Sequence, residues 1–308
     1  MLFSTKSIGL EICQEEARFA LVGGKRGYPR LDACFMSPFP SETVRLSTKE
    51  PNVLNPSAFI AVVRDTYLRL LTDNKRVSVS LPDAIGRIML LDLETRFKSK
   101  DEGRDIIRWK LKKSIPFDIN EVHLDYQVLE EKETGEISTL VSLISRQVVT
   151  QFEELLLEAG LEANRIDFTT FNRYRLFAER LDLTANAAFI TFFGKAVSIL
   201  VFKSGILEFY RSKELAGGTM DADRVFREIN SSLLVYREKY PGHVVNQAFC
   251  GASFEDLEIL RSVVAEVTGL EPVSLDVERV LSRKNGLTAD NRTLSLITAA
   301  LGAATRNL

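Results

Sequence analysis

Apolar residues alternate with small or polar ones in two pairs of short segments, one near the start of the chain and one beyond its middle. Ser7–Ile12 and Ala17–Val22 form the first pair, and Ala187–Phe193 and Ala196–Phe202 form the second, with Gly194-Lys195 between them. This spacing predicts a β-hairpin at the head of each half of the chain. Two halves that begin alike indicate an internal duplication.

Helical periodicity follows each hairpin. Apolar residues recur every three or four positions in four segments, and they define the faces Phe59, Val63, Tyr67 and Leu70; Val148, Phe152, Leu155 and Leu156; Val225, Ile229, Leu233 and Tyr236; and Leu257, Leu260, Val264 and Val267. Strands are predicted at Val77–Leu81, Ile137–Ser145 and Val244–Gly251. Residues 164–183 are expected to cross between the halves as a helix, and residues 281–292 to form a mobile loop. Strands that alternate with helices predict an α/β fold.

A basic helix is predicted in the middle of the first half. Arg104, Arg108 and Lys112 recur at every fourth position and share one face, while Ile107 and Leu111 share another. Because a proline disfavours the helical conformation of the residue before it, Pro116 should end the helix near residue 114. Residues 122–129 then alternate in polarity, as in a half-buried strand.

Composition narrows the class of protein. The chain has 308 residues, of which 45% are apolar and 27% are charged, with a net charge of -2. These values predict a globular protein with no nucleic-acid partner, because basic and acidic residues balance along the chain. Glu11 and its acidic neighbours interrupt any leader-like apolar run, and residues 294–304 are far shorter than the roughly 20 residues of a membrane span. We therefore expect no signal peptide and no direct membrane span.

Residues with catalytic or metal-binding chemistry are few. The two histidines, His123 and His243, have no metal-ligand or nucleophile spacing around them, and the chain contains no P-loop and no dinucleotide-binding glycine motif. The three cysteines, Cys13, Cys34 and Cys250, are unevenly spaced in apolar contexts, which favours reduced thiols in a reducing compartment. We assign no catalytic residue and no metal site.

One passage resembles a known family. From Arg108 to Leu129 a basic helix leads into Ile115-Pro116-Phe117, an acidic turn and a strand that carries Asp125-Tyr126. This order resembles the inserted small subdomain of the PilM family, which are actin-like cytoplasmic proteins of type IV pilus assembly. On spacing alone, the passage also fits an ordinary helix-turn-strand unit with a solvated basic face.

The resemblance implies an actin-like fold, that is, a duplicated ribonuclease H-like α/β fold with an inserted α+β subdomain. It implies a subdomain 1A at residues 1–85 and 147–184, an inserted subdomain 1C at residues 86–146, and a trimmed second half, subdomain 2A, at residues 185–308. In such folds a helical lid, subdomain 2B, covers the base of a nucleotide. The chain has almost nothing between Gly218 and the helix around Phe226, so this lid is expected to be reduced or missing.

The nucleotide-binding positions that the resemblance implies are degenerate. The matching residues are Gly9, Glu11, Arg18, Gly194, Gly217, Gly218 and Gly251. In the family, an acidic residue on the first strand positions the metal and the attacking water, and glycines let backbone amides approach phosphate. Here Cys13 replaces a glycine, Glu15 adds a negative charge where phosphate would lie, and Thr191 and Phe193 replace the Asp and Gly of the second turn. No cofactor is expected, although ATP with magnesium remains an alternative.

The family resemblance therefore favours a cytoplasmic scaffold, peripheral to the inner membrane, in the assembly platform of the type IV pilus or the related type II secretion system. Its implied partners are the short cytoplasmic tail of a PilN-like bitopic membrane protein and other pilus assembly proteins. The tail is expected to contact Arg104, Arg108, Trp109, Lys112, Ile115, Phe117 and Tyr126. Trp109 fits equally well as an exposed anchor or as a core residue. The alternatives are an ATPase that couples nucleotide state to pilus assembly and, less favoured, a filament protein that resembles FtsA.

Overall fold

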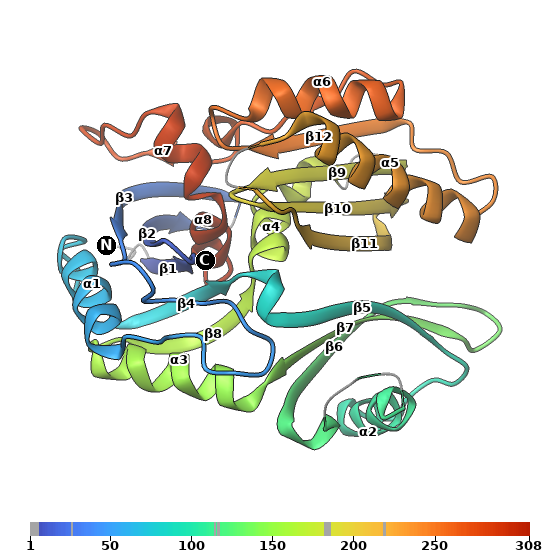
Figure 1. The fold of residues 1–308 in the computed structure, drawn as a ribbon, viewed down its shortest axis with the longest axis horizontal. Helices are drawn as coiled ribbons and strands as arrows, with labels where there is room; N and C mark the ends of the chain where they lie inside the picture. Colours follow the sequence, from blue (N-terminus) through green and yellow to red (C-terminus); the bar gives the residue numbers. More distant parts are fainter. Residues whose placement is uncertain (1–5, 26, 114, 116–117, 182–185, 218–219) are drawn as a thin grey trace.

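The computed structural model describes residues 6–25, 27–113, 115, 118–181, 186–217 and 220–308. The first half is built on a six-stranded sheet with the order β14-β3-β2-β1-β4-β8 (Figure 1). The strands are β1 (Ser7–Ile12), β2 (Glu16–Lys25), β3 (Tyr28–Pro38), β4 (Arg76–Leu81), β8 (Glu162–Phe168) and the short β14 (Ser282–Arg283). β1, β2 and β3 are antiparallel neighbours, whereas β4 and β8 continue the sheet in parallel with β1. The first predicted hairpin is confirmed.

The second half repeats this plan. Its sheet has the order β11-β10-β9-β12-β13. The strands are β9 (Asn186–Phe193), β10 (Ala196–Lys203), β11 (Ile206–Glu214), β12 (Gln247–Ala252) and β13 (Val273–Ser274). Again three antiparallel strands are followed by two parallel ones. The same strand order in both sheets agrees with the duplication that the two hairpins predict.

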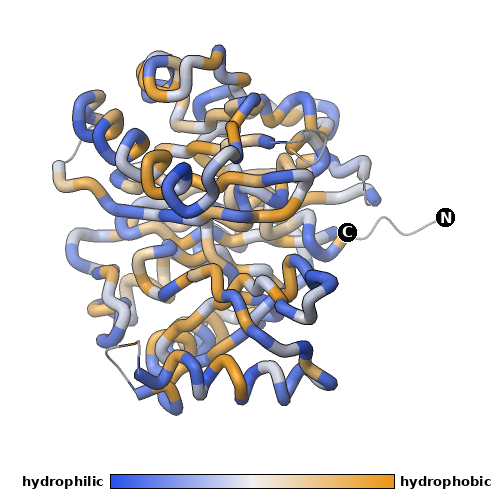
Figure 2. The backbone as a smooth tube through the Cα atoms, turned by 90° about the vertical axis from the view of Figure 1, so that its right-hand side faces the viewer, coloured by the Kyte–Doolittle hydropathy of each residue, from blue (hydrophilic) through white to orange (hydrophobic). Residues whose placement is uncertain are grey.

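Helices complete five layers. The outer face of the first sheet packs against α1 (Pro56–Leu68) and α3 (Arg146–Glu158), and the outer face of the second sheet packs against α5 (Ala222–Lys239) and α6 (Leu257–Thr268). Between the sheets lie α4 (Thr169–Leu181) and α8 (Thr298–Thr305), preceded by the short α7 (Asn291–Leu296) (Figure 1). The peripheral helices alternate between hydrophilic and hydrophobic positions (Figure 2). In contrast, α8 is apolar and buried almost all round, because the first sheet and α4 both pack against it.

A small subdomain is inserted between β4 and α3. It consists of a three-stranded antiparallel sheet with the order β5-β7-β6, covered by α2. Its elements are η1 (Asp83–Ile85), β5 (Gly86–Leu93), α2 (Lys100–Leu111), η2 (Ile119–Glu121), β6 (Val122–Glu131) and β7 (Ile137–Ser145). Helix α2 begins after Ser99, whose hydroxyl accepts a hydrogen bond from the amide of Glu102. Strands β5 and β6 are the two edges of this sheet.

The structure corrects three local predictions. Residues 164–168, predicted as helix, belong to the edge strand β8, and α4 begins only at Thr169. The strand predicted from Val244 begins at Gln247. The predicted loop at residues 281–292 contains β14, and Asp290 within it caps α7 by accepting a hydrogen bond from the amide of Thr293. The edge strands β8 and β14 each have one neighbour in the sheet, so their hydrophobic pattern is weak.

Two features bear on the predicted organisation. In the described part of the chain, no helix or strand lies between the end of β11 at Glu214 and the start of α5 at Ala222. Among the described residues, no helix combines the length and the apolar composition that a membrane span requires.

Candidate functional site

The cleft between the two halves contains a cavity of about 690 Å³, here called the front cavity. Its walls come from three parts of the molecule. The first half contributes the β1–β2 turn and Leu46, the inserted subdomain contributes residues 86–89 of β5, and the second half contributes the β9–β10 turn and β11. The cavity therefore lies where a ligand would contact the main unit, the inserted subdomain and the second half together.

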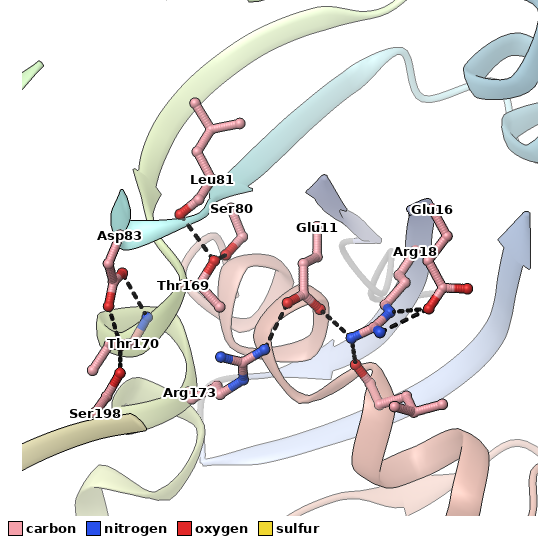
Figure 3. Close-up of polar contacts among 11 residues, drawn as sticks. Glu11, Glu16, Arg18, Ser80, Leu81, Asp83, Thr169, Thr170, Arg173 and Ser198 are labelled. Atoms are coloured by element: carbon pink, nitrogen blue, oxygen red, sulfur yellow. Dashed lines mark hydrogen bonds and ion pairs between the residues drawn. The ribbon is translucent and has the colours of Figure 1, made fainter. Parts of the chain in front are cut away.

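Glu11 lies at the back of this cavity and is fully paired. It is 1% exposed, and its two carboxylate oxygens contact different arginines (Figure 3). Oε1 accepts a hydrogen bond from Nη2 of Arg173 at 2.7 Å, and Oε2 accepts one from Nη1 of Arg18 at 3.4 Å. Arg18 also pairs with Glu16 at 2.7 Å and donates to the carbonyl oxygen of Leu296 at 2.8 Å. The predicted phosphate contact, Arg18, is thus engaged within the protein.

Arg173 reaches this carboxylate from α4 and touches the second half as well. Its guanidinium carbon lies 4.0 Å from the ring centroid of Phe193, the last residue of β9. Burial lowers the pKa of the Arg173 guanidinium, and the charge of Glu11 acts in the opposite direction. A cation–π contact and a buried ion pair therefore join β1, α4 and β9 through one side chain.

The first turn of the cleft is closed on itself. The amide of Cys13 donates a hydrogen bond to the carbonyl oxygen of Glu16 at 2.9 Å. The amide of Phe39 donates one to the carbonyl oxygen of Glu15 at 2.7 Å. Burial also raises the pKa of the Cys13 thiol, so this side chain remains a neutral thiol. The turn that would hold phosphate in a nucleotide site instead presents a thiol and the exposed carboxylate of Glu15.

A second polar cluster surrounds Thr170, one turn before Arg173 on α4. Asp83 of η1 accepts hydrogen bonds from the amide and the hydroxyl of Thr170 (Figure 3). It also accepts one from the hydroxyl of Tyr210 on β11, at 3.1 Å. The hydroxyl of Thr170 also contacts that of Ser198 on β10 at 2.8 Å. Burial raises the pKa of Asp83, and burial together with the Asp83 charge raises the pKa of Tyr210. This cluster ties the base of the inserted subdomain to the second half.

Arg173 and Phe193 also line a smaller cavity of about 330 Å³ on the far side of the cleft, here called the rear cavity. Its other walls include Gly251 at the end of β12 and Phe254 in the turn before α6. The predicted residue Gly251 therefore lines the rear cavity. The side chains of Arg173 and Phe193 border both cavities.

The predicted glycines have different environments. Gly9 is covered by α8, because a Cβ atom there would overlap the carbonyl oxygen of Ala300. Gly194 and Gly217 have φ angles of 62° and 116°, and Gly194 lies at the exposed β9–β10 turn. Gly218 lies outside the described residues. Of the predicted glycines that the structure describes, Gly194 alone lines the front cavity, and Gly9 serves the close packing of strand and helix.

The described residues do not fit a magnesium ion at Glu11. Both of its oxygens contact guanidinium groups, and a divalent cation there would lie against two positive charges. Within the described residues, no group of three or more His, Cys, Asp or Glu side chains could hold a metal ion.

The predicted partner surface on the inserted subdomain is divided between exposed and buried residues. Trp109 is 80% exposed, so the structure decides between the two readings of this residue in favour of a surface position. Arg104 pairs with Asp101 at 3.0 Å and approaches Asp125 at 3.8 Å. Arg108 is 4.0 Å from Asp105, and Lys112 is exposed at the end of α2. Trp109 and Lys112 are thus exposed, Arg104 and Arg108 are half-buried, and acidic neighbours reduce the charge of the stripe.

Other members of the predicted set belong to the core of the subdomain. Ile115 is 8% exposed, and Tyr126 packs edge-on against Phe97 with a centroid distance of 5.3 Å. The hydroxyl of Tyr126 donates to the carbonyl oxygen of Lys100, next to Gly103, where any Cβ atom would overlap the tyrosine ring. Phe117 lies outside the described residues. Tyr126 therefore holds α2 against β6.

Sequence reasoning missed the residues that connect the cleft, namely Arg173, Asp83, Thr170 and Tyr210. Arg173 is one of several arginines in residues 164–183, and nothing local distinguishes it from them. Its partner Glu11 lies far away in the sequence. The only local signal was Phe193, an aromatic residue where the family has glycine.

Comparisons with known proteins agree with this architecture. The family model of the type IV pilus assembly protein PilM matches residues 9–232. No curated protein matches the sequence. Among solved structures, the PilM-PilN type IV pilus biogenesis complex is similar, with a TM-score of 0.82 and 18% identity over 98% of both chains. A Bacteroides thetaiotaomicron protein with an actin-like ATPase fold and unknown function gives a TM-score of 0.51 with 13% identity, over 95% of this chain and 96% of that one.

The cytoplasmic domain of EpsL, an inner membrane component of the type II secretion system of Vibrio cholerae, is also similar. Its TM-score is 0.50 with 12% identity, over 96% of this chain and 94% of that one. Two like α/β halves around a central cleft, with these structural relatives, define an actin-like protein. Because the family model covers well over half of the chain, the protein belongs to the PilM family of type IV pilus assembly proteins.

Proposed function

We propose that this protein is a cytoplasmic scaffold of the pilus assembly platform, and that it binds the cytoplasmic tail of a PilN-like bitopic inner-membrane protein. Trp109 is the observation that carries this proposal. A tryptophan that is 80% exposed on a charged helix supports an interface at this face, because tryptophan is enriched among the residues that carry binding energy. The solved PilM-PilN complex, which is similar in fold, supports the choice of partner.

The inserted subdomain offers an extended peptide the means of recognition that it requires. Strand β6 is an edge of its sheet, so an extended chain could add to it through backbone hydrogen bonds. Arg108 and Lys112 flank Trp109 on α2 and would favour acidic groups of the tail. The association with the inner membrane would then come from the partner, and the protein itself would remain peripheral.

The test is a titration of a fluorescein-labelled synthetic peptide, with the sequence of the cytoplasmic tail of the PilN-like protein, into wild-type and variant protein. Trp109→Ala should weaken binding about 10- to 100-fold, since burial of one large side chain contributes roughly 1.5–3 kcal/mol. Its thermal stability should not change. Leu157→Ala, at another exposed apolar residue, is the control and should bind normally. Normal binding by the Trp109 variant would remove α2 from the interface.

The front cavity is the second candidate surface for the tail, because the main unit and the inserted subdomain both line it. Leu46 of the main unit lines it together with Ile88 and Met89 of β5. Leu46→Ala in the same titration distinguishes the two surfaces. Loss of binding in this variant, with normal binding by the Trp109 variant, would place the tail in the cavity.

The alternative function is an ATPase that couples nucleotide state to pilus assembly. The pairing of Glu11 with two arginines and the carboxylate of Glu15 oppose it. We expect calorimetry with ATP and magnesium to give no saturable heat at micromolar protein, and phosphate release to stay at background. A micromolar dissociation constant, with turnover that Glu11→Ala abolishes, would establish the ATPase.

A further inference from the structure

Helix α4 connects the two halves, and its first two turns contact both of them. Thr169 donates a hydrogen bond from its hydroxyl to the carbonyl oxygen of Leu81 on β4, at 2.9 Å. Thr170 contacts Asp83 on one side and Ser198 of the second half on the other. Arg173, one turn further, contacts Glu11 and Phe193. Any movement of one half against the other must therefore break contacts of this short segment.

Among these contacts, that of Arg173 with Glu11 is the most demanding electrostatically. Arg173 is 6% exposed and Glu11 is 1% exposed, so neither charge is solvated by bulk water. Each must be compensated by a partner within the protein. Arg18 and Glu16 complete a group of two positive and two negative charges, which is neutral as a whole. The group loses its balance if Arg173 moves away from β1.

The other face of the guanidinium fixes Arg173 to the second half. The ring of Phe193 lies under it at 4.0 Å, and Phe193 is itself 8% exposed. Phe193 directly precedes the β9–β10 turn, which forms one wall of the front cavity. A single side chain thus spans the cleft from a carboxylate of the first half to an aromatic ring of the second.

We propose that Arg173 is a permanent clasp between the two halves. It supplies to the buried carboxylate of Glu11 the positive charge that a bound cation could otherwise supply, so the cleft stays closed without a ligand. Because the guanidinium is part of the chain, its effective concentration at Glu11 does not depend on any solute. The clasp makes the orientation of the two halves, and of the inserted subdomain that contacts both, a fixed property of the protein.

A double-mutant cycle tests the clasp. The variants are Arg173→Met, Glu11→Gln and the combination, with Arg76→Met, at an exposed pair with Glu162, as the control. The measurement is amide hydrogen exchange in β1 and β9. Glu11→Gln leaves the charge of Arg173 without its carboxylate, and Arg173→Met leaves Glu11 with Arg18 alone, at 3.4 Å. Each single variant should accelerate exchange about a hundredfold, which corresponds to about 3 kcal/mol.

The double variant should exchange far more slowly than the product of the two single effects predicts, because neither charge is then left alone. The control should match the wild type. Additive effects of the two substitutions would show that the residues act independently and would overturn the proposal. Should either single variant fail to fold, Arg173→Lys keeps the charge but loses the planar fork, and it should still accelerate exchange about tenfold.

Independence from ligands is tested with magnesium chloride alone and with magnesium and ATP together. Neither addition should change exchange in β1 or β9 of the wild-type protein by more than about twofold. A tenfold slowing in the wild type with either addition would mean that the cleft closes on a ligand, and the clasp would be wrong. This result is separate from the peptide titration, which can succeed or fail whatever closes the cleft.

Discussion

The cleft and the outer surface of the inserted subdomain satisfy their charges in opposite ways. In the cleft, the side chains of Glu11, Arg18 and Arg173 are nearly buried and bind one another. On α2, Trp109 is 80% exposed, and the arginines pair only with exposed aspartates. Exposed ion pairs of this kind contribute little to stability, usually below about 1 kcal/mol. The charges of the cleft are therefore compensated inside the fold, whereas those on α2 remain at the surface.

Gly9→Ala should have the largest effect, because it disrupts the packing of α8 on β1 beside the cleft. The new Cβ atom would overlap the carbonyl oxygen of Ala300, so α8 must move away from β1. We expect a loss of about 3 kcal/mol in the free energy of unfolding, measured by urea denaturation. Gly251→Ala is the matched control, since its nearest neighbour would be Cγ2 of Thr191 at 3.6 Å, and its effect should be within about 0.5 kcal/mol. Equal stability of both variants would show that α8 adapts freely.

Asp83→Asn tests how the buried carboxyl of Asp83 makes the stability of the protein depend on pH. The pKa of Asp83 is raised above its usual value of 3.8, chiefly by burial. Below that value the carboxyl is protonated in both the folded and the unfolded states. As the pH rises, the unfolded chain loses this proton first, so the wild type loses stability until the folded carboxyl also ionises. The asparagine variant has no such group.

Urea denaturation of both proteins between pH 3.5 and about 7 measures this difference. The stability of the wild type relative to the variant should fall as the pH rises and then level off. A difference that rises with pH would mean that the hydrogen bonds from Thr170 and Tyr210 lower the pKa of Asp83 by more than burial raises it.

Gly194→Ala should have the smallest effect. The turn is exposed, and an added Cβ atom would have no neighbour within 4 Å, so only the φ angle of 62° opposes it. The cost should be about 1 kcal/mol by urea denaturation. Lys195→Ala in the same turn should be neutral. Pilus assembly in cells should continue with either variant, and its loss with Gly194→Ala would show that the turn has a role that the structure does not explain.

The sequence predicted the fold better than the site. Alternating and helical patterns are local, so the two hairpins and the helices α1, α3, α5 and α6 follow from them directly. Strands β3, β5 and β11 were not predicted, and the terminal helices were noted only as an apolar run. Helix α8 is buried on all sides, so it has no polar face to reveal its period.

The pairing in the cleft could not be predicted for a different reason. The residue types around Glu11 predict a degenerate nucleotide motif, because Cys13 and Glu15 lie close to Glu11 in the sequence. The partner that compensates Glu11 is Arg173, which reaches it only after the sheet and the crossing helix have formed. Likewise, the burial of Tyr126 depends on Gly103 and Phe97, whose positions follow from the packing of α2.

The contact between Gly9 and Ala300 joins segments that leave the ribosome far apart in time. Strands β1 to β4 are synthesised early, yet the groove over Gly9 stays uncovered until α8 emerges. The first half therefore exposes an apolar surface while most of the remaining chain is synthesised. Such an exposed surface favours chaperone binding or aggregation. Contacts of such long sequence separation also slow folding.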